Sequence, residues 1–264
     1  MNVLQRLLET KKQRLDQAKS RMPLRELQAQ IDEAEPPRDF ITAVRSQRTI
    51  RLVAELKKAS PSRGIIRPDF DPVTIARIYE EHGANAVSCL TEEDYFQGHL
   101  SFLPLVHNAV KLPVLRKDFI FDAYQIYESR VNNADAVLLI AAALETNQAQ
   151  DYLNLAQELG MAVLFEVHNE ADLEQALAIE APIVGINNRD LVTLKIDFET
   201  TFRLKVQIPP GIIVVGESGI ATRADVVRLN AANIDAMLVG TVLMKSKDVG
   251  AKTRELLGTV QADA

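Results

Sequence analysis

Short apolar runs recur along the chain, and each of them ends in residues that carry a charge, an amide or a hydroxyl. The first run, from Ile50 to Leu56, leads into Glu55-Leu56-Lys57-Lys58-Ala59-Ser60-Pro61-Ser62. Similar runs end near 118, 168, 189, 218 and 241. Near-continuous apolar runs are typical of strands that are covered on both faces. The pattern therefore predicts buried parallel strands that deliver ionisable groups to the loops at their ends.

The stretches between these runs have the periodicity and the start signals of helices. Asp71-Pro72 places a capping residue before a proline, Gly83 ends the same stretch, and Thr222-Arg223-Ala224-Asp225 resembles a capping box. The predicted strands cover 50–56, 86–90, 114–117, 136–140, 162–167, 183–186, 212–215 and 236–239. The predicted helices between them cover 73–82, 102–110, 123–131, 148–159, 171–179 and 198–206, and a helix follows each of the last two strands.

Eight strand-helix units in about 215 residues predict an α/β fold, a (β/α)8 TIM barrel with right-handed crossovers. Residues 1–48 precede the units and form a predicted N-terminal helical extension, with helices near 3–18 and 37–48 that cover the bottom or rim of the barrel. Residues 49–264 form the barrel, and the whole is expected to be a single domain. A doubly wound open sheet is the structural alternative, but no Gly-x-Gly-x-x-Gly turn follows the first strand.

Composition narrows the class of partner. The chain has 264 residues, 47% of them hydrophobic, and a formal net charge of −6 from scattered acidic residues. Nucleic acid is not an expected partner, because no basic stripe is available to neutralise phosphates. The chain contains neither a membrane-spanning run nor the apolar centre of a signal peptide, so a cytoplasmic location is predicted. The single cysteine, Cys89, lies in a predicted strand and is expected to be an inert core residue.

The carboxyl ends of barrel strands converge on one mouth, so their residues are expected to form one site. Each single charge could be an ordinary solvated rim residue, but a concentration of them at five strand ends indicates a polar pocket, because buried charges are costly unless they are paired or used. Interleaved carboxylates and lysines shift one another's pKa values, which suits proton transfer on a small anionic substrate. The strand-end candidates are Glu55, Lys57, Lys117, Glu166, Asn187, Arg189, Glu217 and Ser218.

The last two units contain features of a phosphate site. Gly219 follows Ser218, and Gly240-Thr241 stands where the last strand turns into a helix. Glycine permits close backbone approach, helix N-termini attract anions, and loops after strands seven and eight commonly bind phosphate in barrels. With a charge from Lys57 and a hydroxyl from Ser60, these residues predict a small phosphorylated substrate. The alternative is that the two glycines are only turn residues.

Five motifs follow one another in order along the chain. They are Glu55-x-Lys57-x-x-Ser60-Pro61-Ser62, Thr91-Glu92-Glu93-x-Tyr95-Phe96-x-Gly98, Leu115-Arg116-Lys117-Asp118-Phe119, Gly185-Ile186-Asn187-Asn188-Arg189-Asp190-Leu191 and Gly216-Glu217-Ser218-Gly219-Ile220. Together they resemble the indole-3-glycerol phosphate synthase family of tryptophan biosynthesis. The resemblance implies a carboxy-lyase that converts 1-(2-carboxyphenylamino)-1-deoxyribulose 5-phosphate to indole-3-glycerol phosphate, with loss of carbon dioxide and water. It implies no cofactor and no metal.

The resemblance also implies roles for the candidate residues. Lys117 would be the general acid, Glu166 the acid/base of the later dehydration, and Lys57 the partner of the substrate carboxylate. Glu55 would orient that lysine and a substrate hydroxyl, while Asn187, Arg189 and Glu217 hold the network. The phosphate would lie on Ser60, Gly219, Gly240 and Thr241, and the aromatic ring on Phe96, Phe119 and Leu138. Thr241 departs from the family, which more often has serine there, but keeps the hydroxyl.

The histidines do not indicate a metal site. His82, His99, His107 and His168 lack the spacing of metal ligands, and His168 is expected to be a solvated loop residue. Within enzymes the alternative is an aldolase-type barrel in which Lys117 forms a Schiff base with a ketose phosphate. Outside enzymes it is a non-catalytic barrel scaffold. A monomer or weak homodimer is expected.

Overall fold

The computed structural model describes residues 3–259, and within them eight parallel strands close into a barrel. The order around the barrel is β1, β10, β9, β8, β7, β6, β5 and β4, so each strand lies beside its neighbour in the chain. The barrel strands are β1 (Arg51–Leu56), β4 (Ala86–Leu90), β5 (Val114–Lys117), β6 (Ala136–Ile140), β7 (Ala162–Val167), β8 (Ile183–Asn187), β9 (Ile213–Glu217) and β10 (Ala236–Val239). The predicted (β/α)8 barrel with a helical extension is confirmed.

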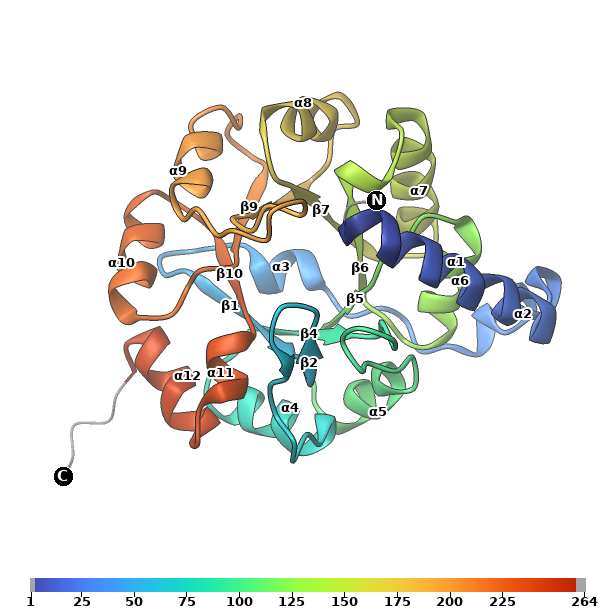
Figure 1. Cartoon of the computed structure of the whole chain (residues 1–264), viewed down its shortest axis with the longest axis horizontal. Coiled ribbons are helices and arrows are strands. Elements are labelled where there is room, and N and C mark those ends of the chain that lie inside the picture. The colour runs from blue at the N-terminus through green and yellow to red at the C-terminus, as the bar shows by residue number, and fades with distance from the viewer. Residues whose placement is uncertain (1–2, 260–264) are drawn as a thin grey trace.

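Helices surround the barrel, as the view along its axis shows (Figure 1). They are α4 (Pro72–Glu81), α5 (Phe102–Ala109), α6 (Ala123–Val131), α7 (Thr146–Glu158), α8 (Glu170–Ala178), α9 (Glu199–Lys205), α10 (Arg223–Ala231), α11 (Thr241–Lys245) and α12 (Val249–Leu257), with a 3-10 turn at Ala141–Ala143. The start signals seen in the sequence act as expected. The Asp71 side chain accepts a hydrogen bond from the backbone N–H of Thr74, and Thr222 and Asp225 form a capping box.

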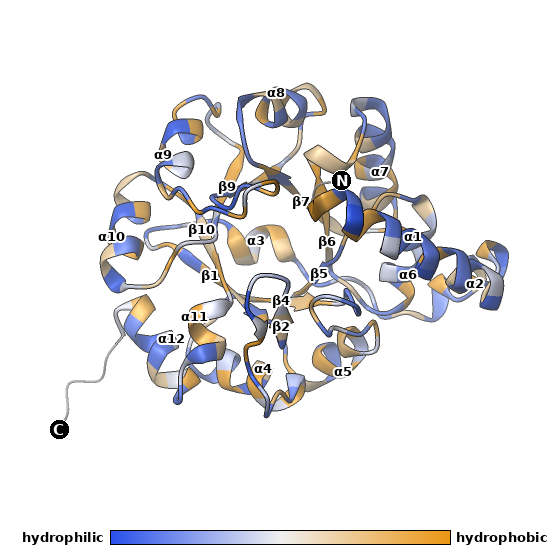
Figure 2. Ribbon diagram, viewed as in Figure 1, coloured by the Kyte–Doolittle hydropathy of each residue, from blue (hydrophilic) through white to orange (hydrophobic). Residues whose placement is uncertain are grey.

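Two apolar layers follow from the alternation of side chains along each strand. Outward residues such as Leu52 and Ala54 of β1 pack against the ring of helices, whereas inward residues such as Val53 fill the barrel. Figure 2 shows the same division, because the hydrophobic colour follows the barrel strands and the inner faces of the helices. None of the helices within residues 3–259 is long and apolar enough to cross a membrane.

The N-terminal segment contributes α1 (Val3–Arg21), α2 (Leu24–Ala29), a 3-10 turn at Ile31–Glu33 and α3 (Phe40–Val44). Phe40 and Val44 of α3 belong to the apolar cluster inside the barrel, and α3 is seen through the barrel in Figure 1. Asp135 at the start of β6 accepts hydrogen bonds from the backbone N–H groups of Arg38, at 2.7 Å, and Val114, at 2.6 Å. These contacts fix the segment to the amino ends of the strands.

One local prediction is wrong, and two short features were not predicted. The helix expected at 37–48 is only α3, because Asp39 caps a helix that ends where Arg45 becomes extended (φ −74°, ψ 121°). The short helix α2 and the turn after it were not predicted, since neither has a sustained apolar period. The loop after β1 contains an unpredicted hairpin of two short strands, β2 (Ala59–Ser60) and β3 (Gly64–Ile65). The domain division at residue 48 stays a prediction.

Candidate active site

The alternation of each strand explains how charge reaches the centre of the barrel. Along β5 the inward positions are Leu115 and then Lys117, and along β7 they are Leu164 and then Glu166. The strands β1 and β9 repeat the pattern with Glu55 and Glu217 at their last inward positions. The lower inward residues are apolar and make the floor. The last inward residue of each of these strands therefore stands on an apolar layer and faces the mouth.

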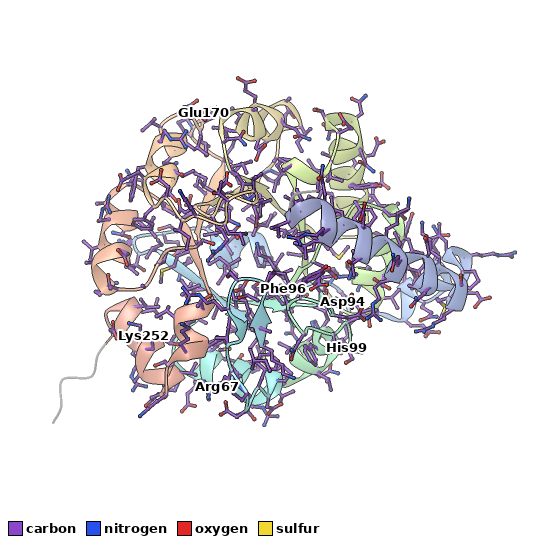
Figure 3. The ribbon with its side chains drawn as sticks, viewed as in Figure 1. Arg67, Asp94, Phe96, His99, Glu170 and Lys252 are labelled. Atoms are coloured by element: carbon purple, nitrogen blue, oxygen red, sulfur yellow. The ribbon has the colours of Figure 1, made fainter. Side chains whose placement is uncertain are left out.

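A cavity of about 390 Å³ lies above this floor. Most of the candidate residues predicted from the sequence line it, namely Glu55, Lys57, Phe96, Lys117, Phe119, Leu138, Glu166, Asn187, Arg189, Glu217, Ser218, Gly219, Gly240 and Thr241. Phe96 comes from the loop after β4 and lies near the centre of the molecule in Figure 3, whereas Glu170 and Lys252 lie in the outer ring. Segments far apart in the sequence thus contribute to one site.

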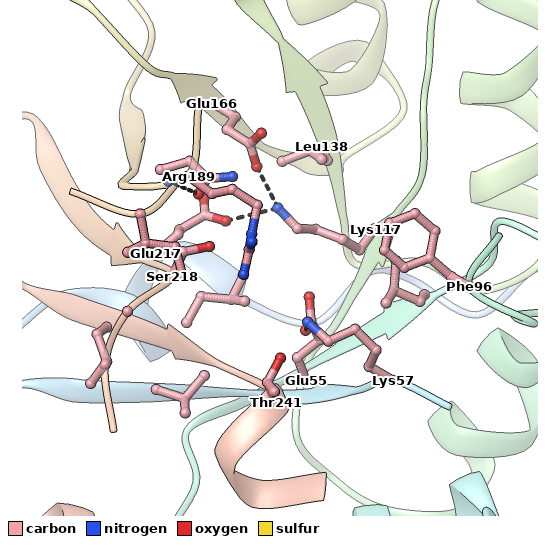
Figure 4. A pocket seen from close by; sticks show the side chains of 18 of the residues that line it. Glu55, Lys57, Phe96, Lys117, Leu138, Glu166, Arg189, Glu217, Ser218 and Thr241 are labelled. Atoms are coloured by element: carbon pink, nitrogen blue, oxygen red, sulfur yellow. Dashed lines mark hydrogen bonds and ion pairs between the residues drawn. The ribbon is translucent and has the colours of Figure 1, made fainter. Parts of the chain in front are cut away.

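Lys117 is held between two carboxylates. Its Nζ donates to Glu166 Oε2 at 2.5 Å and to Glu217 Oε2 at 2.8 Å, as the dashed lines in Figure 4 mark. Burial opposes the charge of Lys117, but Glu166, Glu217 and Glu55 outweigh it and raise the pKa of the lysine above its ordinary value. The side chain is therefore an ammonium group aimed into the cavity, where it can donate a proton to a bound oxygen.

The two carboxylates that hold Lys117 differ in their proton affinity. Burial would raise the pKa of Glu166, but the Lys117 ammonium and His168 lower it below its ordinary value. Burial raises the pKa of Glu217, and Glu166 adds to this, against the opposing effect of Lys117. Glu217 Oε1 is buried and has no hydrogen-bond partner within the described residues. The site therefore offers one firmly ionised carboxylate and one that is ready to take a proton.

A second pair lies across the cavity. Lys57 forms an ion pair with Glu55, whose side chain is only 5% exposed. A side chain at Gly240 would overlap the Glu55 carboxylate, and one at Gly185 would overlap the Glu217 carboxylate. Glycine at these two positions is thus a condition for the carboxylates to occupy their places.

One side of the mouth is suited to an anion. Ser218 and Gly219 both have positive φ angles, 63° and 82°, so the chain turns sharply after β9. Asn188 holds this turn, because its Nδ2 donates to the Ser218 carbonyl at 2.9 Å. Gly240 and Thr241 lie beside it on the cavity wall. Two cations that sequence analysis missed, Arg63 and Lys245, also line the cavity, and only their positive charge close to these motifs could have pointed to them.

The opposite side of the cavity is apolar. Phe96 and Phe119 have ring centroids 6.5 Å apart and are tilted by 44°. Leu138 on β6 and Leu90 and Ile140 at neighbouring strand ends extend this wall. In Figure 4 the stem of Lys117 lies on the side of Phe96, and its ammonium group points away from that ring towards Glu166 and Glu217. An aromatic ring bound against this wall would therefore lie along the Lys117 side chain.

Not all predictions about single residues agree with the structure. Ser60 lies in β2 of the hairpin after β1 and is not among the residues that line the cavity. The prediction that His168 is solvated is wrong, because its side chain is 7% exposed and lies between Glu166 and Asp172. The helix α8 begins two residues later, at Glu170, and Asp172 in its first turn contacts the ring. Cys89 is fully buried, as predicted, and burial raises its pKa to about 12.

Comparison with known proteins shows which family the chain belongs to. The family model of indole-3-glycerol phosphate synthase matches residues 4–256. An indole-3-glycerol phosphate synthase of Dehalococcoides mccartyi is 51% identical over 259 residues, which are 97% of this chain and 100% of that protein. Its counterpart from Pelodictyon phaeoclathratiforme is 46% identical over 251 residues, 95% and 98% of the two chains.

Solved structures of lower identity show the same fold. A 3-hexulose-6-phosphate synthase superposes with a TM-score of 0.65 at 14% identity, covering 80% of this chain and 100% of that one. A chain of the tryptophan synthase complex from Pyrococcus furiosus superposes with a TM-score of 0.60 at 15% identity, covering 79% of this chain and 98% of that one. The match of the family model and the identity of the full-length relatives establish that the chain belongs to the indole-3-glycerol phosphate synthase family.

Proposed function

We propose that the cavity binds 1-(2-carboxyphenylamino)-1-deoxyribulose 5-phosphate and that the chain converts it to indole-3-glycerol phosphate, carbon dioxide and water. The chain is a carboxy-lyase of tryptophan biosynthesis by its family. The observation that supports the residue roles best is the Lys117 ammonium held between Glu166 and Glu217. It places a proton donor in a site with an apolar wall for a ring and a polar wall for a phosphate.

The substrate would bind with its two ends on opposite walls. Its phosphate would lie at Gly219, Gly240 and Thr241, near the cations Arg63 and Lys245. Its ring would lie against Phe96, Phe119 and Leu138. Lys57 would leave Glu55 to pair with the ring carboxylate. This arrangement holds the ring carbon that bears the carboxylate close to the ketone carbon of the sugar.

Ring closure would then use the proton of Lys117. As the ring carbon attacks the ketone carbon, the carbonyl oxygen takes a proton from Lys117 and becomes a hydroxyl. Loss of carbon dioxide returns its bonding electrons to the ring. The hydroxyl then leaves as water, while Glu166 accepts and returns the protons that this step moves. Glu55, Asn187, Arg189, Glu217 and Ser218 would orient the two lysines and the substrate.

The two alternatives from sequence analysis have less support. A Schiff base requires a neutral lysine, whereas the carboxylates around Lys117 favour its ammonium form. A scaffold would be expected to lack part of the charged set, but each candidate catalytic side chain is present and lines the cavity. The monomeric or weakly dimeric state, the absence of nucleic acid from the partners and the cytoplasmic location stay predictions.

Product fluorescence tests the proposed function. The chain contains no tryptophan, so the indole of the product is detected without tryptophan fluorescence from the protein. Purified protein mixed with substrate in chelator should produce indole fluorescence and one carbon dioxide for each indole. Lys117→Ala should be inactive, and the matched variant Lys111→Ala, which removes an exposed lysine between α5 and β5, should retain full activity. No fluorescence from the wild type would contradict the proposal.

A further inference from the structure

His168 connects the active-site carboxylate Glu166 to a second carboxylate outside the cavity. It follows the last residue of β7, and its Nε2 lies 3.2 Å from Glu166 Oε1. Its Nδ1 lies 3.3 Å from Asp172 Oδ2. Lys117 contacts the other oxygen of Glu166, Oε2, from the cavity side. Neither His168 nor Asp172 lines the cavity, so the histidine supports Glu166 from the side away from the substrate.

The start of α8 fixes the orientation of the imidazole ring. Asn169 caps the helix, and its side chain accepts the backbone N–H of Asp172 at 3.0 Å. Asp172 in turn reaches back and accepts the backbone N–H of His168 at 2.9 Å. The same carboxylate oxygen, Oδ2, faces Nδ1 of the ring. With Nδ1 facing Asp172, Nε2 lies on the side of Glu166, at ion-pair distance from Oε1 but without the geometry of a hydrogen bond among the described residues.

We propose that the His168–Asp172 pair positions Glu166 and keeps it ionised when Lys117 turns from Glu166 to the substrate. The inference rests on the proposed function, in which Lys117 gives its proton to the substrate and Glu166 later accepts one. A carboxylate that is 2% exposed loses its stabilising cation when Lys117 moves away. The imidazolium of His168 is a second cation that stays in place. His168 is therefore a positioning residue, since it acts through Glu166 and does not contact the cavity.

The charges around His168 favour its protonated form. Burial lowers the pKa of the imidazole, but Asp172 and Glu166 outweigh burial and raise the pKa to about 9. Asp190, in the loop after β8, is a third carboxylate within range of its charge. Lys117 on β5 is the nearby cation on the far side of Glu166. Three carboxylates from three elements thus act on the ring, and it carries its proton at neutral pH.

The dependence of kcat on pH tests this role. His168→Asn removes the charge but keeps a polar side chain, so Glu166 should take up a proton more readily in the variant. We expect the ratio of the variant's kcat to that of the wild type to be about one tenth or less at pH 6. The ratio should rise towards one above pH 9, where the wild-type imidazole is neutral too, while KM changes less than about threefold. A ratio that is constant with pH would overturn the proposal.

Asp172→Asn, the other member of the pair, should lose activity at the opposite end of the pH range from His168→Asn. This variant keeps His168 but lowers the pKa of its ring, so activity should be near normal at pH 6 and fall relative to the wild type between about pH 7 and 9. A purely structural role would give both variants the same pH dependence. His99→Asn is the matched control, because His99 is exposed and, within residues 3–259, its side chain forms hydrogen bonds with Ser101 alone and packs near Phe102. Its profile should match the wild type.

Nuclear magnetic resonance of ¹³C-labelled histidine tests the charge without any turnover. The chain has four histidines. We expect one of them to remain protonated at pH 8, and to titrate at lower pH in Asp172→Asn even if His168→Asn does not fold. Titration of all four histidines below about pH 7 would overturn the inference. Wild-type protein that shows the protonated histidine but forms no product would contradict the proposed function instead.

Discussion

Lys11→Met tests how strongly the N-terminal helix α1 is fixed to the catalytic strand. Lys11 Nζ lies 2.7 Å from Asp118 Oδ2, next in the chain to Lys117, and the two side chains are 9% and 0% exposed. Asp118 Oδ2 also accepts from Arg116 Nη2 at 3.0 Å and from the Thr91 hydroxyl at 2.6 Å. The variant therefore removes one of two cations from a buried carboxylate and leaves the other.

The magnitude follows from the pKa of Asp118. Burial would raise this pKa, but Lys11 and Arg116 lower it from 3.8 to about 2. A carboxyl group whose pKa is lowered by this amount on folding contributes about 2.5 kcal/mol to the free energy of unfolding at neutral pH. That contribution is present above about pH 4 and is lost as the pH falls towards 2. Because Arg116 remains, we expect Lys11→Met to lower the free energy of unfolding by about 1–2 kcal/mol at pH 7, which corresponds to a fall of about 4 °C in Tm.

Thermal unfolding followed by circular dichroism at pH 7 measures the loss. Arg14→Met is the matched control, since Arg14 stands on the same helix and pairs with Asp94, but with 46% and 28% of the two side chains exposed. Exposed pairs contribute little, and we expect a cost below about 0.5 kcal/mol. Equal losses in the two variants, or no loss in Lys11→Met, would refute the reasoning that burial gives the Lys11 pair its strength.

Two further predictions follow from single positions. Gly240→Ala should reduce kcat/KM by about a hundredfold, because a methyl group there displaces the Glu55 carboxylate and its partner Lys57. Steady-state kinetics measures the loss, and a circular dichroism spectrum checks that the variant is folded. Unchanged kinetics would contradict the prediction. Cys89, the single cysteine, should resist alkylation by iodoacetamide at pH 8 in the native protein and react with it in urea. Mass spectrometry measures the extent of labelling. Rapid labelling of the native protein would contradict the burial of this residue.

The barrel could be predicted from the sequence because its signal is local and repeated. Each strand is an apolar run bounded by turn or capping residues, so the predicted strands agree with the structure to within about two residues at their ends. The helix α3 and the hairpin of β2 and β3 could not be predicted in this way. They are short, and contacts with distant parts of the chain fix their ends, such as the hydrogen bond from the Ser46 N–H to Asp235.

The candidate site could be predicted because parallel strands of a barrel end at one mouth, which brings Glu55, Lys117 and Glu217 together whatever their separation in sequence. The alternation of side chains along a strand does not predict which residues pair with one another outside the cavity. Arg116 points outward from β5 and is fully buried, where it binds Asp118 and Glu128. His168 likewise depends on Asp172, whose approach is determined by the packing of α8 on the barrel.

Lys117 is proposed to donate the proton of ring closure and not chiefly to bind the substrate. The most direct test compares substrate affinity and turnover in Lys117→Ala, with isothermal titration calorimetry for the first and single-turnover indole fluorescence for the second. If Lys117 is the proton donor, the Kd of the variant should stay within about threefold of the KM of the wild type, while turnover falls by a factor of at least 100. Binding and turnover that fall by the same factor, or turnover that survives, would contradict it.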